Sequence, residues 1–154
     1  MFERMLHKIW EKCWTVGVVD GGISSVLEND DFSVKWLKIP RDRWFADPFV
    51  LDVIGDEIQL LVEDYEYKKS KAAISLLKIH KQTKRIISRK VILELDTHLS
   101  FPNILRKNGR VYVYPENCRG GGLVLYEYNV EQEELKPYKL ICADKVWDSV
   151  ITFA

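Results

Sequence analysis

Four carboxylates stand where short apolar strands begin or end, and they are the residues best placed to carry chemistry. Asp47 precedes Pro48 in an aromatic frame, Glu63 follows Leu-Leu-Val, Glu116 follows Tyr-Val-Tyr-Pro, and Asp148 opens Asp-Ser-Val-Ile. A carboxylate in such a place is costly to bury, so it is solvated, paired or functional. Two of them facing one cavity suit glycoside chemistry, one as nucleophile or base and one as proton donor. Asp47, Glu63, Glu116 and Asp148 are therefore the candidates for such a pair.

Side chains near these carboxylates have the types that bind sugars. Aromatic rings stack on sugar rings, and cationic or amide groups donate hydrogen bonds to hydroxyl or anionic groups. The predicted substrate-binding residues are Arg43, Trp44, Glu63, His98, Asn103 and Trp147. Arg41 and Phe45 are further candidates of the same kinds.

Each candidate also has an ordinary structural role open to it. Asp47 could cap a turn by accepting backbone N–H groups, and His98 could be hydrogen-bonded within a loop. Glu116 could form a salt bridge of small value at a hairpin edge. Asp64 and Glu66 are expected to be solvated. Aromatic rings are more often core and inter-sheet packing than sugar platforms, because their area holds such sheets together.

The elements that must position these residues are almost all short strands. Strands are predicted at 14–20, 32–39, 45–54, 57–67, 73–80, 85–95, 101–107, 110–116, 123–129, 134–141 and 146–153. Gly55 and Asn108-Gly109 mark hairpin turns, and Asp-Gly-Gly-Ile-Ser-Ser at 20–25 is interpreted as a turn. Apolar residues recur at helical spacing in the first dozen positions, which predicts a short amphipathic helix there. The fold class is therefore all-β with at most that one helix.

An internal repeat organises these strands. The aligned pairs are Pro48 with Pro102, Gly55 with Gly109 and, after one deletion, Glu63 with Glu116. Each unit holds four short strands in about fifty residues, which is typical of a propeller blade, because a lone sheet of this size cannot bury both faces. The alternative is an ordinary meander or sandwich whose turns coincide.

The repeat divides the chain into leading strands at 14–44, one blade at 45–98, a second at 99–146 and the start of a third at 147–154. A propeller closes only with at least about four blades. We therefore expect a single incomplete domain, open and crescent-shaped. Its unclosed edge would favour self-association or a second chain that completes the propeller.

The motifs resemble a known superfamily. Trp-Phe-Ala-Asp-Pro-Phe-Val, Leu-Val-Glu-Asp-Tyr, His-Leu-Ser-Phe-Pro-Asn-Ile and Val-Tyr-Pro-Glu-Asn resemble the five-bladed propellers of arabinanases, levansucrases and invertases. The resemblance is closer to the N-terminal propeller domain of plant glucosamine inositolphosphorylceramide transferases, and it runs from about Trp14 to the C-terminus. It implies that Asp47 is the base or nucleophile, that Asp148 orients it, and that Glu116 stands in for the acid. Asp148-Ser149 and Pro115-Glu116-Asn117 depart from the hydrolase pattern.

Composition excludes several function classes. The 23 basic residues equal the 23 acidic ones, so no excess positive field collects nucleic acid. No apolar run approaches the roughly 18 to 20 residues of a membrane helix, which argues against membrane insertion. Three widely spaced cysteines and scattered histidines indicate free thiols and no metal or other cofactor, and hence a reducing, cytoplasmic compartment.

These observations predict a carbohydrate-handling propeller associated with glycosidase or glycosyltransferase chemistry, in polysaccharide or glycolipid synthesis. Its ligand would be a carbohydrate or glycan. Two alternatives remain open: a non-catalytic module that binds glycan or protein through the same cavity, and an inactive structural fragment with no site.

Overall fold

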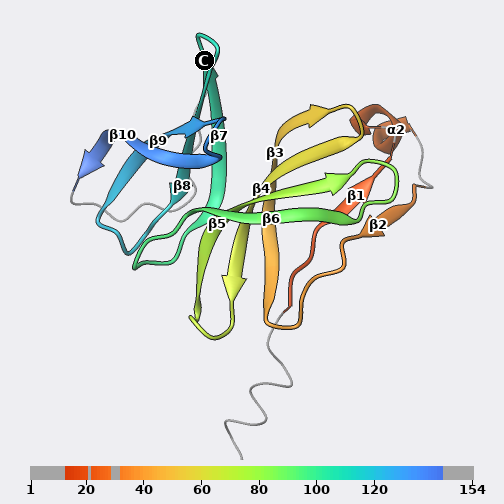
Figure 1. Cartoon of the computed structure of the whole chain (residues 1–154), viewed down its shortest axis with the longest axis horizontal. Helices are drawn as coiled ribbons and strands as arrows, with labels where there is room; N and C mark the ends of the chain where they lie inside the picture. The colour runs from red at the N-terminus through yellow and green to blue at the C-terminus, as the bar shows by residue number, and fades with distance from the viewer. Residues whose placement is uncertain (1–12, 21, 29–31, 144–154) are drawn as a thin grey trace, which may run out of the picture.

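The computed structural model describes residues 13–20, 22–28 and 32–143 (Figure 1). Within these ranges strands are the dominant secondary structure and one short helix is the only helix, which confirms the all-β prediction. The predicted amphipathic helix in the first dozen residues, and the predicted strand over 146–153, lie outside the described residues.

The described strands follow one another along the chain with short connections. They are β1 (Gly17–Val19), β2 (Val34–Trp36), β3 (Arg43–Ile54), β4 (Glu57–Glu66), β5 (Lys71–His80), β6 (Ile86–Leu93), β7 (Ser100–Lys107), β8 (Arg110–Glu116), β9 (Gly122–Asn129) and β10 (Glu134–Ala143). From β3 onward each lies within about two residues of its predicted bounds, as expected for element ends. The predicted strand over 32–39 is longer than β2.

The turn interpretation of residues 20–25 is wrong for most of that segment. A short helix, α2 (Gly22–Glu28), occupies it. A Gly-Gly pair is typical of a turn. The six residues that follow Gly22, however, include no helix breaker, and Ile23 and Leu27 are four positions apart, which places them on one helix face. Both side chains remain largely exposed.

The strands form two four-stranded antiparallel sheets and one two-stranded sheet. Sheet 1 has the order β3-β4-β5-β6, sheet 2 runs β7-β8-β9-β10, and β1 pairs with β2. In Figure 1 they stand side by side as three layers, with sheet 1 between sheet 2 and the β1–β2 pair. The first strands of the two large sheets, β3 and β7, are neighbours, as are their last strands, β6 and β10. None of the sheets in the described ranges closes on itself.

Sheet 1 buries both of its faces, as the two core clusters show. Leu61, Ile74 and Leu76 pack on one face against Leu99 and Val113 of the sheet 2 side. On the other face Leu60, Val62 and Leu77 pack with Val16 and Leu37 of the leading segment. This double burial explains why the centre of β4 has three consecutive apolar residues, Leu60, Leu61 and Val62, where a strand with one solvated face would alternate.

The positions aligned in the sequence repeat adopt the same unusual backbone. Asp47 and Phe101, each preceding a proline, both have φ of 47°. Each sits where the pairing register shifts, between Ala46 and Phe49 in β3 and between Ser100 and Asn103 in β7. A proline cannot donate to a sheet ladder, so a bulge is the place that accommodates it.

Candidate functional site

An open pocket of about 650 Å³ lies where the leading segment, β3 and β7 meet. The described residues that line it are Trp14, Thr15, Val16, Gly17, Trp44, Ala46, Asp47, Pro48, Phe49, Glu63 and Phe101. The β3 bulge brings Asp47 to its wall, and β4 contributes Glu63 from the position paired with Ala46. Three predicted site residues therefore line one cavity: Asp47, Trp44 and Glu63.

Glu63 is the buried acid of this pocket, with a side chain 8% exposed. Its Oε1 lies 3.0 Å from His98 Nε2. Its carboxyl group is also within hydrogen-bonding contact of the Asp47 carboxyl. The structure thus brings together Asp47, Glu63 and His98, which come from β3, β4 and the connection between the two large sheets.

The orientation of His98 follows from its second ring nitrogen. His98 Nδ1 accepts a hydrogen bond from the backbone N–H of Ala72, at 3.1 Å. Nδ1 is therefore unprotonated, and Nε2 carries the hydrogen that is donated to Glu63. The backbone N–H of Leu99 also donates to the Ala72 carbonyl, at 3.1 Å. His98 therefore also has the structural role that the sequence left open for it. It anchors the connection between the two large sheets to β5, and at the same time it holds Glu63.

Asp47 joins the two repeats. Its Oδ2 accepts a hydrogen bond from the backbone N–H of Phe101, at 3.2 Å. Phe101 is the aligned residue of the second repeat, so the carboxylate of one bulge caps the backbone of the next. Asp47 therefore fulfils the capping role expected as its alternative, and it also contacts Glu63 in the pocket.

Aromatic rings form the apolar walls. Trp44 stacks flat on Tyr65, with ring centroids 4.6 Å apart and an interplanar angle of 4°. Phe49 and Phe101 meet edge to face at 5.1 Å. Trp14 is 55% exposed at the pocket rim. The pocket therefore combines apolar aromatic walls with two carboxyl groups that can accept hydrogen bonds.

Burial raises the pKa of Glu63 above its usual value of 4.5. The hydrogen bond from His98 opposes this rise in pKa, and the contact with Asp47 adds to it. Two carboxyl groups in contact share a proton more readily than they both ionise. Glu63 therefore retains its proton to a higher pH than an exposed glutamate would.

This shift predicts how stability responds to pH. A folded-state pKa above the unfolded one means that the native state binds more protons, so the stability due to Glu63 is lost as pH rises through its folded-state pKa. Glu63→Gln mimics the protonated form at every pH. The difference in free energy of unfolding, variant minus wild type, is expected to grow from about pH 4 to pH 7 in urea titrations.

Glu133→Gln is the matched control for that titration. A hydrogen bond from Lys78 lowers the pKa of Glu133, and the Lys78 Nζ to Glu133 Oε1 distance is 2.5 Å. Stability due to Glu133 is therefore present at neutral pH and lost as pH falls, so its variant should show the opposite trend. Parallel trends in the two variants would contradict the assignment of a raised pKa to Glu63.

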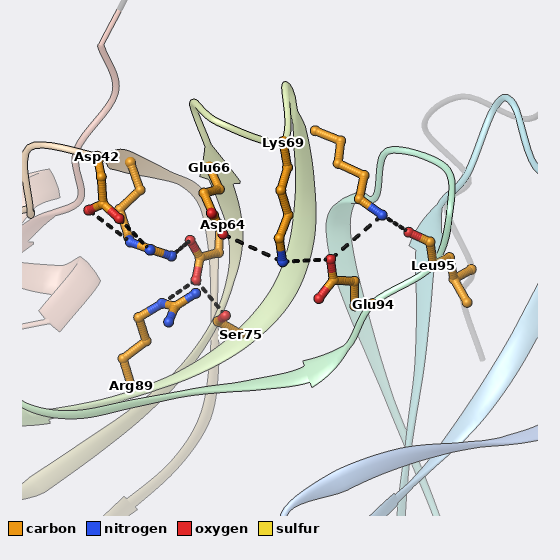
Figure 2. Close-up of polar contacts among 10 residues, drawn as sticks. Asp42, Asp64, Glu66, Lys69, Ser75, Arg89, Glu94 and Leu95 are labelled. Carbon is orange, nitrogen blue, oxygen red and sulfur yellow. Dashed lines mark hydrogen bonds and ion pairs between the residues drawn. The ribbon is translucent and has the colours of Figure 1, made fainter.

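Arg43 lies outside the pocket, in an ion-pair network around Asp64 (Figure 2). The fully buried Asp64 carboxylate meets Arg43 Nη1 at 3.2 Å and Ser75 Oγ at 2.6 Å, and it also accepts from Arg89 Nε. Arg43 in turn binds the exposed Asp42 at 2.6 Å. The expectation that Asp64 is solvated is wrong, because neighbouring strand positions face opposite sides and both sides of β4 are covered.

The remaining predicted residues do not line this pocket. Glu116 pairs with Ser100 at the end of β8 and accepts a hydrogen bond from Ser100 Oγ, at 3.2 Å. Asn103 Nδ2 donates to the Phe101 carbonyl, at 3.2 Å. Trp147 and Asp148 lie outside the described residues.

Sequence reasoning missed Trp14 and the role of Asp64. A signal existed for Asp64: it follows Leu-Leu-Val-Glu without a turn, so it belongs to a strand buried on both faces, where an acid needs a basic partner. Trp14 reaches the pocket because the leading segment packs beside β3. No local sequence pattern predicts that tertiary packing.

All three cysteines are described, and each is a free thiol. No helix in the described ranges has the length and apolar character needed to cross a membrane. The same part of the chain brings no three His, Cys, Asp or Glu side chains into an arrangement that could hold a metal ion. Comparison with protein-family models, curated proteins and solved structures gave no match to this chain.

Proposed function

We propose that the protein is a carbohydrate-handling module that binds a glycan in the pocket of Asp47 and Glu63. One observation carries the proposal: a hydrogen-bonded carboxyl pair lies in an open cavity whose other walls include Trp14, Trp44 and Phe101. Carboxyl groups accept hydrogen bonds from sugar hydroxyls, and aromatic rings pack on sugar C–H faces.

We further propose that the two large sheets are blades of a partial β-propeller of the arabinanase, levansucrase and invertase type. Three layers follow in chain order, and the first strands of the two large sheets, β3 and β7, are neighbours. The bulges of β3 and β7 repeat the same backbone. A two-layer sandwich would leave the second face of sheet 1 open, whereas a propeller repeats the packing around an axis. The pocket then lies beside the innermost strands.

The geometry supports binding better than hydrolysis. Retaining glycosidases hold their two carboxyl groups about 5–5.5 Å apart, and inverting ones about 6.5–9.5 Å apart. Asp47 and Glu63 instead lie in contact on neighbouring strands of one sheet, and do not face each other across the cavity. Glu116, the predicted acid, belongs to sheet 2 and does not line the cavity. The carboxyl pair is therefore proposed as a ligand-orienting group rather than as a nucleophile and acid.

Calorimetric titration with short neutral arabinan and fructan oligosaccharides tests this function. Trp14→Ala is expected to weaken binding about tenfold, because an aromatic stacking face is worth roughly 1–1.5 kcal/mol. Trp36→Ala is the matched control, since Trp36 is 63% exposed but lies outside the pocket. Equal losses in both variants, or no heat with any oligosaccharide, would contradict the proposal. If reducing ends are released from the oligosaccharides, the protein hydrolyses them, and the proposal of a non-hydrolytic binding site is wrong.

A further inference from the structure

A second hollow lies on the far side of the leading segment and has a different chemical character. It measures about 640 Å³ and is lined by Trp36, Lys38, Thr83, Lys84, Arg85 and Ile86. One wall comes from the end of β2 and the residues just after it. The other wall comes from the turn between β5 and β6 and from the start of β6. Lys35 Nζ reaches the carbonyl of Gln82 at 3.5 Å, which ties β2 to that hairpin.

The indole ring of Trp36 packs closely against the neighbouring strand β1. Gly17 pairs with Trp36 across the β1–β2 ladder. A side chain at Gly17 would come within 2.9 Å of the Trp36 ring and 2.6 Å of Val34. The indole therefore lies across the bare backbone of Gly17, and its large exposed fraction, 63%, faces outward. An exposed tryptophan held in one orientation offers a stacking face with little conformational entropy left to lose on binding.

Some cationic side chains at this hollow contact a carboxylate, and others do not. The Lys84 ammonium is buried and binds the Asp20 carboxylate and the Lys81 carbonyl. Lys35 lies 3.5 Å from the same Asp20. Lys38 and Arg85 are exposed, and within residues 13–20, 22–28 and 32–143 neither side chain has a carboxylate partner or a hydrogen bond. Among the residues that the structure describes, no carboxylate lines the hollow.

We propose that this hollow binds a short anionic glycan, with a sugar ring on Trp36 and its carboxylate or sulfate groups on Lys38 and Arg85. A guanidinium and an ammonium beside one groove recognise anionic oxygens through charge-assisted hydrogen bonds. Of the lining residues that the structure describes, Trp36 alone is aromatic, so a planar base would find no second ring among them to enclose it. The formal charge of the whole chain is zero, which disfavours a nucleic-acid partner. This site is separate from the carboxyl-pair pocket and does not depend on it.

Titration of the tryptophan fluorescence with a trigalacturonate tests the site, with its neutral counterpart galactotriose as the uncharged probe. Trigalacturonate is expected to bind and galactotriose to bind at least tenfold more weakly. Trp36→Ala, Lys38→Gln and Arg85→Gln are each expected to weaken trigalacturonate binding about tenfold, the loss of one charged contact or stacking face. Raising the salt concentration should weaken wild-type binding further.

Two controls keep the test decisive. Lys107→Gln removes an exposed cation from the end of β7, away from the hollow, and Trp14→Ala removes the exposed tryptophan of the other pocket. Both are expected to leave trigalacturonate binding unchanged. The proposal is overturned if trigalacturonate does not bind, if the control variants lose as much affinity as the site variants, or if a nucleoside monophosphate or a short oligonucleotide binds more tightly than trigalacturonate.

Discussion

Asp64→Ala is expected to lower the free energy of unfolding by about 3–5 kcal/mol. The carboxylate is fully buried and holds Arg43 and Arg89, whose side chains are only 12% and 29% exposed. Removing it leaves two guanidinium groups without their shared anion in a site with little access to water. Ser75 Oγ, itself buried, loses its partner as well. Urea unfolding followed by circular dichroism measures the change.

Asp42→Ala is the control for this prediction. Asp42 binds the same guanidinium as Asp64, at 2.6 Å, but its side chain is 50% exposed. Water readily replaces an exposed carboxylate as a partner of the guanidinium group. The unfolding midpoint of Asp42→Ala should therefore remain near that of the wild type. If both variants unfold at the same denaturant concentration, the network around Asp64 does not stabilise the fold as described.

Leu60→Ala and Leu61→Ala are each expected to cost about 2–5 kcal/mol of stability, although they are neighbours on one strand. Adjacent strand residues face opposite sides of a sheet. Leu61 packs on the face toward sheet 2, and Leu60 packs on the face toward the leading segment. Both are almost fully buried, so each substitution opens a cavity in a different core cluster.

The pair of variants tests the layered architecture. A sheet with one solvated face would tolerate alanine at one of the two positions. Val53→Ala, at a residue 48% exposed on β3, should change stability little and provides the baseline. A near-neutral Leu60→Ala would contradict the packing of the leading segment against sheet 1.

Much of the fold could be predicted from local pattern. Gly55 and Gly109 do adopt the positive φ values that hairpin turns require, so the strand boundaries on either side of them agree with the structure. The Pro48–Pro102 alignment also has a structural counterpart, because both bulges repeat the same backbone. The helix over Gly22–Glu28 was missed because the Gly-Gly pair at 21–22 is typical of a turn and the helix is only seven residues long.

The candidate site could be predicted only in part, for a reason of geometry. The repeat aligned Glu63 with Glu116, which suggested one carboxylate from each sheet. The structure instead brings Asp47 to Glu63 within sheet 1, because the β3 bulge shifts the register at Ala46. The second sheet has Phe101 where the first has Asp47, so its own acid at Glu116 meets Ser100 instead. Such a shift depends on tertiary packing and is not encoded in strand periodicity.

The most direct test of the proposed glycan site is a nuclear magnetic resonance titration of the ¹⁵N-labelled chain with the neutral oligosaccharide that binds best. Amide shifts are expected to concentrate at Thr15, Asp47, Glu63 and Phe101, the residues around the carboxyl pair, and to require about tenfold more ligand in Trp14→Ala. Shifts that spread evenly over the surface, or that gather around Trp36 and leave Asp47 and Glu63 unmoved, would contradict the account.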